Sequence, residues 1–262
     1  MNGVSFSKLR VSDAGAVRTI TLFNPERRNA IGRVMVNELL HALEQAHAAR
    51  EVRAIVLTGE GQAFCAGGDF SDMGGASDAT PELPPRGDYA DLLLALVRAE
   101  KPVIARVNGH AMGGGLGLVA ASTFAIADAR AKLGTPEVDV GLFPMMIMAV
   151  LTRLVPRRAL LDMMLLGRKL SAEQARDVGI VNRVVDASEL DAATAELASA
   201  LASKSPATLA LGLRAFADQD TMDLAAALPM LRERLGACLA TEDAREGLTA
   251  FLEKRPPVWK GR

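Results

Sequence analysis

Aromatic residues are scarce in this chain of 262 residues: they make up 4%, with one tryptophan and one tyrosine. Such a composition offers few stacking platforms for single-stranded nucleic acid. An excess of positive charge is also lacking, since the formal net charge is -1, and no basic surface for nucleic acid or lipid is expected. No segment reaches the roughly 20 uninterrupted apolar residues that span a bilayer. We therefore expect neither a nucleic-acid partner nor a membrane partner.

Cysteine is equally rare. Cys65 and Cys238 are the two in the chain, and they lie far apart without metal-ligand spacing. This excludes a disulfide framework or a zinc site and favours a reducing compartment. The first residues, MNGVSFSKLRVSD, have no basic segment followed by an apolar run, so no secretory signal is expected. These features predict a cytoplasmic protein without a bound metal.

Half of the residues are hydrophobic, which is enough to bury a sizeable core. Strand patterns and helical patterns alternate along the first two thirds of the chain. The expected strands are residues 4–11, 16–23, 53–59, 101–109, 124–128 and 182–186, and the expected first helix is 33–50. Repeated strand–helix crossovers of this kind predict an α/β fold.

Two regions depart from this alternation. Residues 71–88 are rich in Gly, Pro, Asp and Ser and predict a long surface loop, of the kind that is either disordered or functional. From about residue 192 onward the pattern is helical, with no further strand. We therefore divide the chain into a core, 1–191, and a helical C-terminal region, 192–262. The leucine and alanine faces of that region must pack on the core or on another subunit.

Glycines cluster at two points where a strand ends. The stretch IVLTGEGQAFCAGGDF reaches Gly67 and Gly68, and VIARVNGHAMGGGLGL reaches Gly113, Gly114 and Gly115 where a helix begins. Glycine leaves the backbone N–H groups open to another molecule, and a helix start favours negative charge. Two such donors that face one point would make an oxyanion hole. Either turn alone could equally be structural.

Other catalytic motifs fail on spacing. A dinucleotide fingerprint starting at Gly113 would need glycine where Leu118 stands, and no GxxxxGK[ST], GxSxG or HExxH is present. His41 and His47 are six residues apart and do not share a helix face. A structural role is expected for His110.

Three motifs, in this order, carry a family resemblance: FCAGGDF, KPVIARVNGHAMGGGLGL and KLGTPEVDVGLFP. Together with NPERRNAIG, residues 151–185 and EGLTAFLEKRPPVWK, they look like the crotonase (enoyl-CoA hydratase/isomerase) superfamily over nearly the whole chain. The resemblance implies a spiral of ββα units with a helical C-terminal region that trimerises, as a homotrimer or a dimer of trimers. It implies an acyl-CoA thioester as substrate, with coenzyme A as part of that substrate and no separate cofactor.

The resemblance also assigns residues. It implies that the N–H groups of Gly68 and Gly114 polarise the thioester carbonyl, and that Glu137, after the G-x-P turn, is the acid/base. On this assignment, the glycine run lets the thioester come close to the backbone. The dipole of the helix that begins there stabilises negative charge on the thioester oxygen. The residues implied in substrate and CoA binding are Arg27, Arg28, Ala30, Gly68, Asp69, Phe70, Ser71, Gly114, Phe251 and Lys254, the last two often approaching from a neighbouring subunit.

One position departs from the family pattern. Hydratases of this family carry a first glutamate three residues after the middle glycine, where this chain has Gly117. A single glutamate suffices for a 1,3-proton shift, so the residues favour double-bond isomerisation by Glu137. Hydration by Glu137 without a second glutamate, and a non-catalytic acyl-CoA-binding or scaffold protein, stay open. Asp139 is the nearest possible second acid, although a solvated role is expected for it.

Side chains near the presumed acyl site leave further alternatives. Met145, Met146 and Met148 would line an adaptable acyl pocket or pack in the core. Dienoyl-CoA isomerases carry an aspartate where this chain has Met145, which disfavours that branch. Asp69 is expected to cap the following turn instead of transferring protons.

Overall fold

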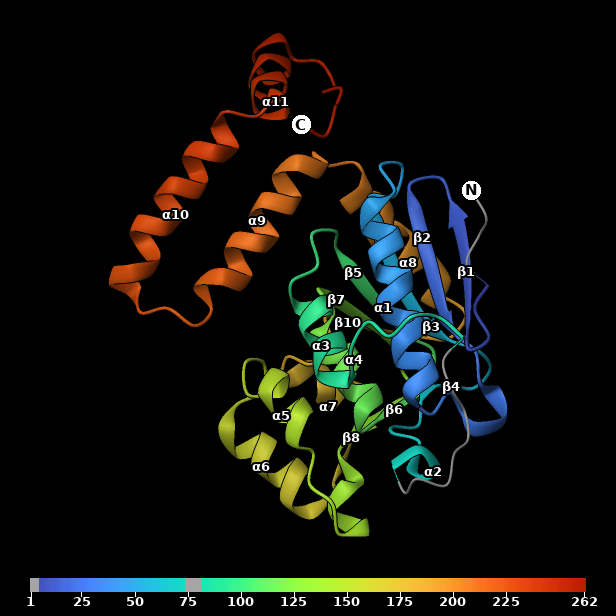
Figure 1. Cartoon of the computed structure of the whole chain (residues 1–262). Helices are drawn as coiled ribbons and strands as arrows, with labels where there is room; N and C mark the ends of the chain where they lie inside the picture. Colours follow the sequence, from blue (N-terminus) through green and yellow to red (C-terminus); the bar gives the residue numbers. More distant parts are fainter. Residues whose placement is uncertain (1–4, 74–81) are drawn as a thin grey trace.

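The computed structural model describes residues 5–73 and 82–262 and contains two β-sheets surrounded by helices (Figure 1). The larger sheet has six strands in the order β1-β2-β3-β5-β7-β10, and all neighbours are parallel except the β1/β2 hairpin. Its strands are β1 Leu9–Ala14, β2 Val17–Leu22, β3 Ala54–Gly59, β5 Val103–Val107, β7 Phe124–Asp128 and β10 Arg183–Val185. The smaller sheet consists of β4 Ala63–Cys65, β6 His110–Met112, β8 Lys132–Gly134 and β9 Lys169–Ser171.

The two sheets are connected by a repeated unit. After β3, β5 and β7 the chain passes at once into the short strands β4, β6 and β8, and then into helical segments. Strands β4, β6 and β8 are parallel neighbours, so their carboxyl ends meet at one edge of the small sheet. This is the ββα repeat expected above, and it places three successive turns side by side.

Both faces of the large sheet are covered, as is usual for parallel strands. Leu57 and Ala105 belong to the main core beneath the helices, whereas Val56 and Ile104 point to the opposite face. Helix α4 lies inside the main core, with seven of its eight residues buried. Helix α4 spans Gly114–Ala121. The other helices before the C-terminal region are α1 Arg33–Ala48, α2 Phe70–Met73, α3 Tyr89–Val97, α5 Met145–Leu151, α6 Arg157–Leu166 and α7 Ala172–Asp177, with 3-10 helices η1 Pro25–Arg27 and η2 Pro136–Val140.

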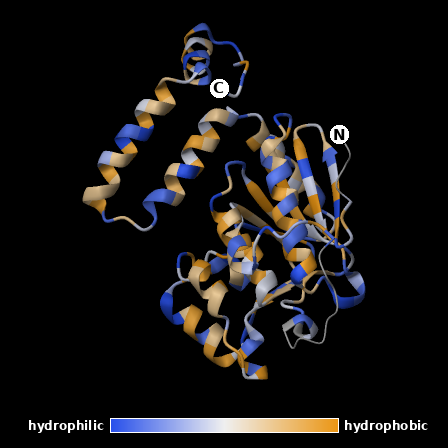
Figure 2. Ribbon diagram, viewed as in Figure 1, coloured by the Kyte–Doolittle hydropathy of each residue, from blue (hydrophilic) through white to orange (hydrophobic). Residues whose placement is uncertain are grey.

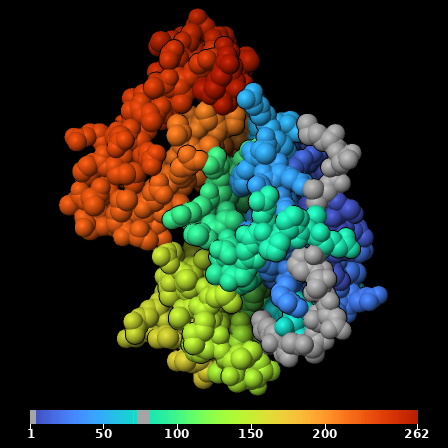
Figure 3. Space-filling view, viewed as in Figure 1, coloured from blue at the N-terminus to red at the C-terminus, as the bar shows by residue number. Residues whose placement is uncertain are grey.

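The C-terminal helices divide into two groups. Helix α8 (Leu190–Ala202) packs on the large sheet, where Ala198 contacts the face formed by Val56 and Ile104. Helices α9 (Pro206–Gln219), α10 (Leu224–Leu239) and α11 (Glu242–Glu253) leave the core as an arm (Figures 1 and 3). Apolar side chains stay exposed along the arm, as in Phe216, Leu224, Phe251 and Leu252. Figure 2 shows that hydrophobic and hydrophilic residues alternate along the helices of the arm. The helices that leave the core are therefore α9–α11. None of the described helices is long and apolar enough to cross a membrane.

The expected strands agree with the structure except at the amino end. The first strand, expected at 4–11, runs from Leu9 to Ala14. The hairpin turn causes this shift: Ala14 pairs with Val17, and Gly15 has a φ of 59°. A two-residue turn fixes the register of both strands, whatever their apolar pattern.

Candidate active site

The two glycine bends lie side by side. Strands β4 and β6 pair in parallel, with Ala63 opposite His110 and Cys65 opposite Ala111, and each is followed by one of the bends. A Cβ added at Gly67 would lie 3.2 Å from the Met112 carbonyl oxygen and 3.9 Å from the Gly113 Cα. The sheet therefore brings together two turns that are separated by about one sixth of the chain.

Each bend presents a backbone N–H group that has no partner among the described residues. The peptides around Gly68 are tied to Ile31, whose N–H donates to the Gly67 carbonyl (2.8 Å) and whose carbonyl accepts from the Asp69 N–H (2.9 Å). Gly114 is the first residue of α4, where N–H groups have no intrahelical acceptor. Within residues 5–73 and 82–262, no acceptor takes the N–H of Gly68 or that of Gly114. Both glycines are partly exposed, so these donors are open to a ligand oxygen.

Close backbone approach requires the glycines themselves. Gly113 has a φ of 48°, and a Cβ there would lie 2.8 Å from Glu137 Oε1. A Cβ at Gly115 would lie 2.6 Å from both the Cβ and the carbonyl oxygen of Cys65. The first turn of α4 is thus wedged between β4 and the carboxylate of Glu137.

Glu137 provides an acid/base group at this turn. It lies in η2, and its Oε1 faces Gly113. Among the described residues, its buried Oε2 has no hydrogen-bond partner, and burial raises the pKa of the carboxyl group. A raised pKa and a free oxygen both favour the use of a carboxyl group to accept and return a proton.

Asp139 is not a partner for Glu137. Because Pro136–Val140 forms a 3-10 helix instead of an extended segment, the two side chains diverge. Asp139 is exposed, and its carboxylate lies beside Gly167 at the end of α6. Of the three methionines considered for the acyl site, Met145 and Met146 are exposed, while Met148 packs against the core.

Three of the residues expected to bind CoA, Arg27, Asp69 and Ser71, form a polar cluster near the first bend. Arg27 Nη1 donates to Asp69 (2.9 Å) and to the Ser71 hydroxyl (2.6 Å), and the Ser71 N–H donates to Asp69 Oδ1 (3.0 Å). Hydrogen bonds from Ser71, followed by the Arg27 guanidinium, lower the pKa of Asp69. Asp69 thus acts as a cap of α2, as expected. Arg28 accepts from the Ala66 N–H through its carbonyl, and Ala30 donates to the Arg27 carbonyl.

Three predicted residues are not part of this cluster. Phe70 begins α2, but its side chain lies outside what the structure describes. Phe251, in α11, is 82% exposed, and Lys254 ends that helix with a φ of 55°. Both lie in the arm, away from β4 and β6 (Figure 1). A single chain therefore does not bring Phe251 and Lys254 to the glycine bends.

Asn29 holds the connection between β3 and β4, the strand that leads into the first bend, and the sequence motifs did not reveal it. It is fully buried with a φ of 57°, and its Nδ2 donates to the carbonyls of Glu60 (2.9 Å) and Ala63 (2.9 Å). Its Oδ1 accepts from the Asn24 N–H (2.9 Å). The sequence signal that could have indicated this role is an asparagine in a loop. After glycine, asparagine is among the residues that most readily adopt the left-handed backbone conformation.

Replacing Asn29 by alanine is expected to lower the free energy of unfolding by about 3 kcal/mol, because buried carbonyls lose their donor. Urea unfolding followed by circular dichroism measures this loss. The matched control is Asn24→Ala, whose side chain does not cap η1 and whose effect should stay within about 0.5 kcal/mol. Equal losses in both variants would contradict the role of Asn29.

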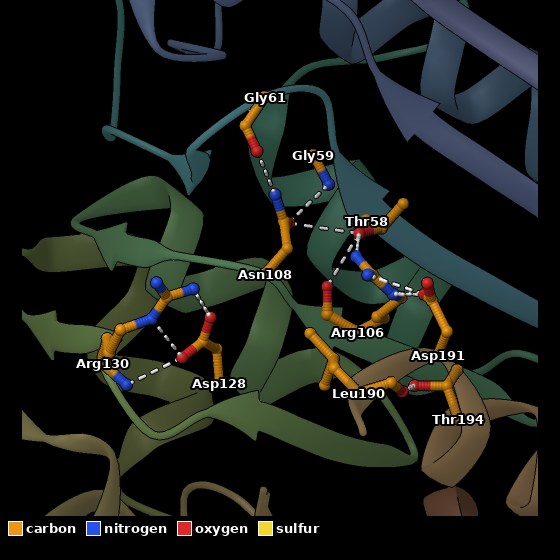
Figure 4. Close-up of polar contacts among 10 residues, drawn as sticks. All are labelled: Thr58, Gly59, Gly61, Arg106, Asn108, Asp128, Arg130, Leu190, Asp191 and Thr194. Carbon is orange, nitrogen blue, oxygen red and sulfur yellow. Dashed lines mark hydrogen bonds and ion pairs between the residues drawn. The ribbon is translucent and has the colours of Figure 1, made fainter. Parts of the chain in front are cut away.

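Other candidate groups are occupied with structural contacts. His110 Nδ1 accepts from the Lys132 N–H (3.0 Å), in line with the structural role expected for it. A separate cavity of about 390 Å³ lies at the carboxyl ends of β3, β5 and β7 (Figure 4). Its arginines are already paired, Arg106 with Asp191 and Arg130 with Asp128, each at 2.7 Å. The glycine bends, by contrast, offer N–H donors and a carboxylate oxygen that have no partner in the described part of the chain.

The comparisons with known proteins agree with this geometry. Residues 12–262 match the profile of the enoyl-CoA hydratase/isomerase family, and the chain belongs to that family, within the crotonase superfamily. It is 36% identical over 260 residues to a probable enoyl-CoA hydratase of Rhizobium meliloti, covering 99% of this chain and 100% of the relative. It is 32% identical over 243 residues to human enoyl-CoA hydratase domain-containing protein 3, mitochondrial, covering 93% of this chain and 80% of the relative.

Solved structures share the fold. The crystal structure of the human protein superposes with a TM-score of 0.88 at 31% identity, covering 96% of this chain and 100% of that one. The enoyl-CoA hydratase of Bacillus anthracis superposes with a TM-score of 0.89 at 29% identity, covering 98% and 100%. The expected crotonase fold is thereby confirmed.

Proposed function

We propose that this protein is an enzyme that moves the double bond of an enoyl-CoA thioester, with Glu137 as its single acid/base. The observation that carries the proposal is the Glu137 carboxylate, which faces the Gly113–Gly114 turn with one oxygen unpartnered among the described residues. Family membership supports an acyl-CoA thioester as substrate.

The reaction follows from these groups. The N–H groups of Gly68 and Gly114 donate to the thioester oxygen, and the α4 helix start favours the negative charge that develops there. The Glu137 carboxylate removes a proton from C2 of a 3-enoyl thioester, and the electron pair moves onto the thioester oxygen to form a dienolate. The carboxylic acid then returns the proton to C4, which yields the 2-enoyl thioester and regenerates the carboxylate.

Binding of coenzyme A is assigned to the polar cluster and the adjacent backbone. Arg27 lies beside Ser71 and can turn its 57% exposed side chain toward a phosphate. Coenzyme A enters as part of the substrate, and no separate cofactor is proposed. The exposed apolar arm supports assembly as a homotrimer or a dimer of trimers, in which Phe251 and Lys254 would close the site of a neighbouring subunit. Bacterial relatives support a cytoplasmic location.

Two alternatives make different predictions. A hydratase that uses Glu137 alone would add water to a 2-enoyl thioester, and the names of several relatives favour it. A non-catalytic acyl-CoA-binding protein would bind the thioester without exchanging its α-protons. The glycine at position 117 favours isomerisation over hydration, because hydration conventionally uses two carboxylates.

A panel of 2-enoyl and 3-enoyl CoA thioesters tests the proposal, with hydration and double-bond migration measured separately by NMR. We expect migration of the 3-enoyl thioesters at least about tenfold faster than hydration of the 2-enoyl ones, a difference of about 1.4 kcal/mol between the two barriers. Faster hydration would identify a hydratase. Tight binding without either reaction would identify a binding protein.

A further inference from the structure

The space beside Gly117 is filled from two neighbouring helices. A Cβ added at this position would overlap the hydroxyl oxygen of Tyr89, from α3, and lie 2.5 Å from Cγ2 of Ile147, from α5. Real Cβ atoms do not make such contacts, so no side chain fits at 117 without displacement of its neighbours. The absence of a glutamate at this position is therefore matched by the packing around it.

Tyr89 is held at both ends. It is the first residue of α3, which begins with a capping box: Asp88 accepts from the N–H groups of Ala90 (2.8 Å) and Asp91 (3.2 Å), and Asp91 accepts from the Asp88 N–H (2.8 Å). At the other end the Tyr89 hydroxyl donates to the Gly114 carbonyl at 2.5 Å. The ring therefore has a fixed position against the first turn of α4.

This position lies within the candidate active site. A Cβ added at Gly114, the residue that carries a proposed oxyanion donor, would be 3.5 Å from both Cζ and Oη of Tyr89. Burial, with contributions from the charges of Cys65 and Glu137, raises the pKa of Tyr89 well above its ordinary value. The phenol is therefore neutral at physiological pH, and its one proton is engaged by the Gly114 carbonyl.

We propose that Tyr89 determines the reaction specificity of this site, because its hydroxyl occupies the place that the Cβ of a glutamate at position 117 would need. The inference rests on the proposed function and adds a residue to it. With Tyr89 in place, the face of the acyl group next to α4 meets a neutral phenol without a free proton. No carboxylate can position water there, and proton transfer is confined to Glu137.

The test compares two variants that differ in one oxygen atom. Ile147→Ala removes the Cγ2 contact of 2.5 Å at position 117 and leaves the Cβ contact of 3.3 Å, so Gly117→Glu can be introduced in the same chain with Tyr89 present or with Tyr89→Phe. We expect the variant with phenylalanine to hydrate a 2-enoyl thioester about tenfold faster than the variant with tyrosine, which is the size of a coupling between neighbouring residues. Equal hydration rates would overturn the assignment.

A second measurement uses the wild-type protein and does not depend on the folding of variants. Tyr89 is the only tyrosine in the chain, so a ¹³Cζ-tyrosine label gives a single NMR resonance. We expect this resonance to shift when butanoyl-CoA binds but not when coenzyme A without an acyl group binds. The same chemical shift with butanoyl-CoA as with coenzyme A would overturn the assignment.

Failure of the proposed function has a different signature. It would be seen as wild-type protein that performs no double-bond migration on any 3-enoyl thioester. Failure of the Tyr89 assignment alone would leave migration by Glu137 intact, with equal hydration in the two variants or a resonance that the acyl group does not shift.

Discussion

Replacing Glu137 by glutamine is expected to slow double-bond migration and α-proton exchange by about 10²–10⁴-fold, the usual contribution of a general acid/base. The amide has the shape of the carboxyl group but cannot accept the C2 proton. The measurement is deuterium uptake by a bound acyl-CoA in D₂O, followed by NMR or mass spectrometry. Equal exchange in wild type and Glu137→Gln would remove Glu137 from the mechanism.

Two controls separate chemistry from folding in this comparison. Asp139→Asn changes an exposed carboxylate in the same 3-10 helix and should leave exchange unchanged. Burial raises the pKa of Glu137, so its ionisation makes the folded state less stable as pH rises from the ordinary glutamate pKa through the raised one. Glu137→Gln removes that cost, and we expect it to unfold at the same or a higher denaturant concentration than wild type at pH 7.

The raised pKa of Glu137 also determines the expected pH dependence of the wild-type reaction. Proton removal requires the ionised carboxyl group, so kcat/KM should rise with pH through a pKa above the ordinary glutamate value. This rise should be missing from the residual activity of Glu137→Gln.

Replacing Gly114 by proline is expected to lower kcat/KM by at least about 10²–10³-fold, because it deletes one of the two N–H groups that we propose as donors to the thioester oxygen. Proline removes only the hydrogen of the backbone amide at this position, and a ring carbon takes its place. Proline is favoured at the first position of a helix, and Gly113 before it has no Cβ to clash with the ring. Steady-state kinetics with a 3-enoyl thioester measures the effect.

The matched control is Gly114→Ala, which retains the N–H group. Its Cβ would lie 3.5 Å from Tyr89 and 3.6 Å from Ile31, ordinary van der Waals distances. We expect this variant to keep activity within about tenfold of wild type, with unchanged circular dichroism in both variants. A Gly114→Pro protein as active as Gly114→Ala would show that this N–H group does not bind the thioester oxygen.

Much of the large sheet could be predicted from the sequence, because its strands are buried apolar runs bounded by turn residues. The strand expected at 124–128 is observed at Phe124–Asp128, and that expected at 53–59 at Ala54–Gly59. The small sheet could not be predicted. Its strands have three residues each, too few to show a period, and they are held by partners distant in sequence. Yet this sheet sets the two glycine bends beside each other.

For the site, sequence reasoning identified positions but not their surroundings. The motifs pointed to Gly68, Gly114 and Glu137, and the structure places the two bends and the carboxylate together. Their roles remain predictions. Tyr89 and Asn29 were missed because each acts across the fold, on residues that lie 25 or more positions away. Such contacts leave no local pattern in the sequence.

Every amino acid except proline carries a main-chain N–H, so the proposed binding of the thioester oxygen uses the backbone of the two bends and needs no functional side chain there. The proposed proton chemistry is different, because it would depend on the identity of a few side chains at positions 89, 117 and 137. A few substitutions at these positions could therefore change the reaction that such a fold catalyses, while binding of the thioester group is retained. Because backbone N–H groups would bind the substrate and side chains would set the reaction, the reaction can change while substrate binding is kept.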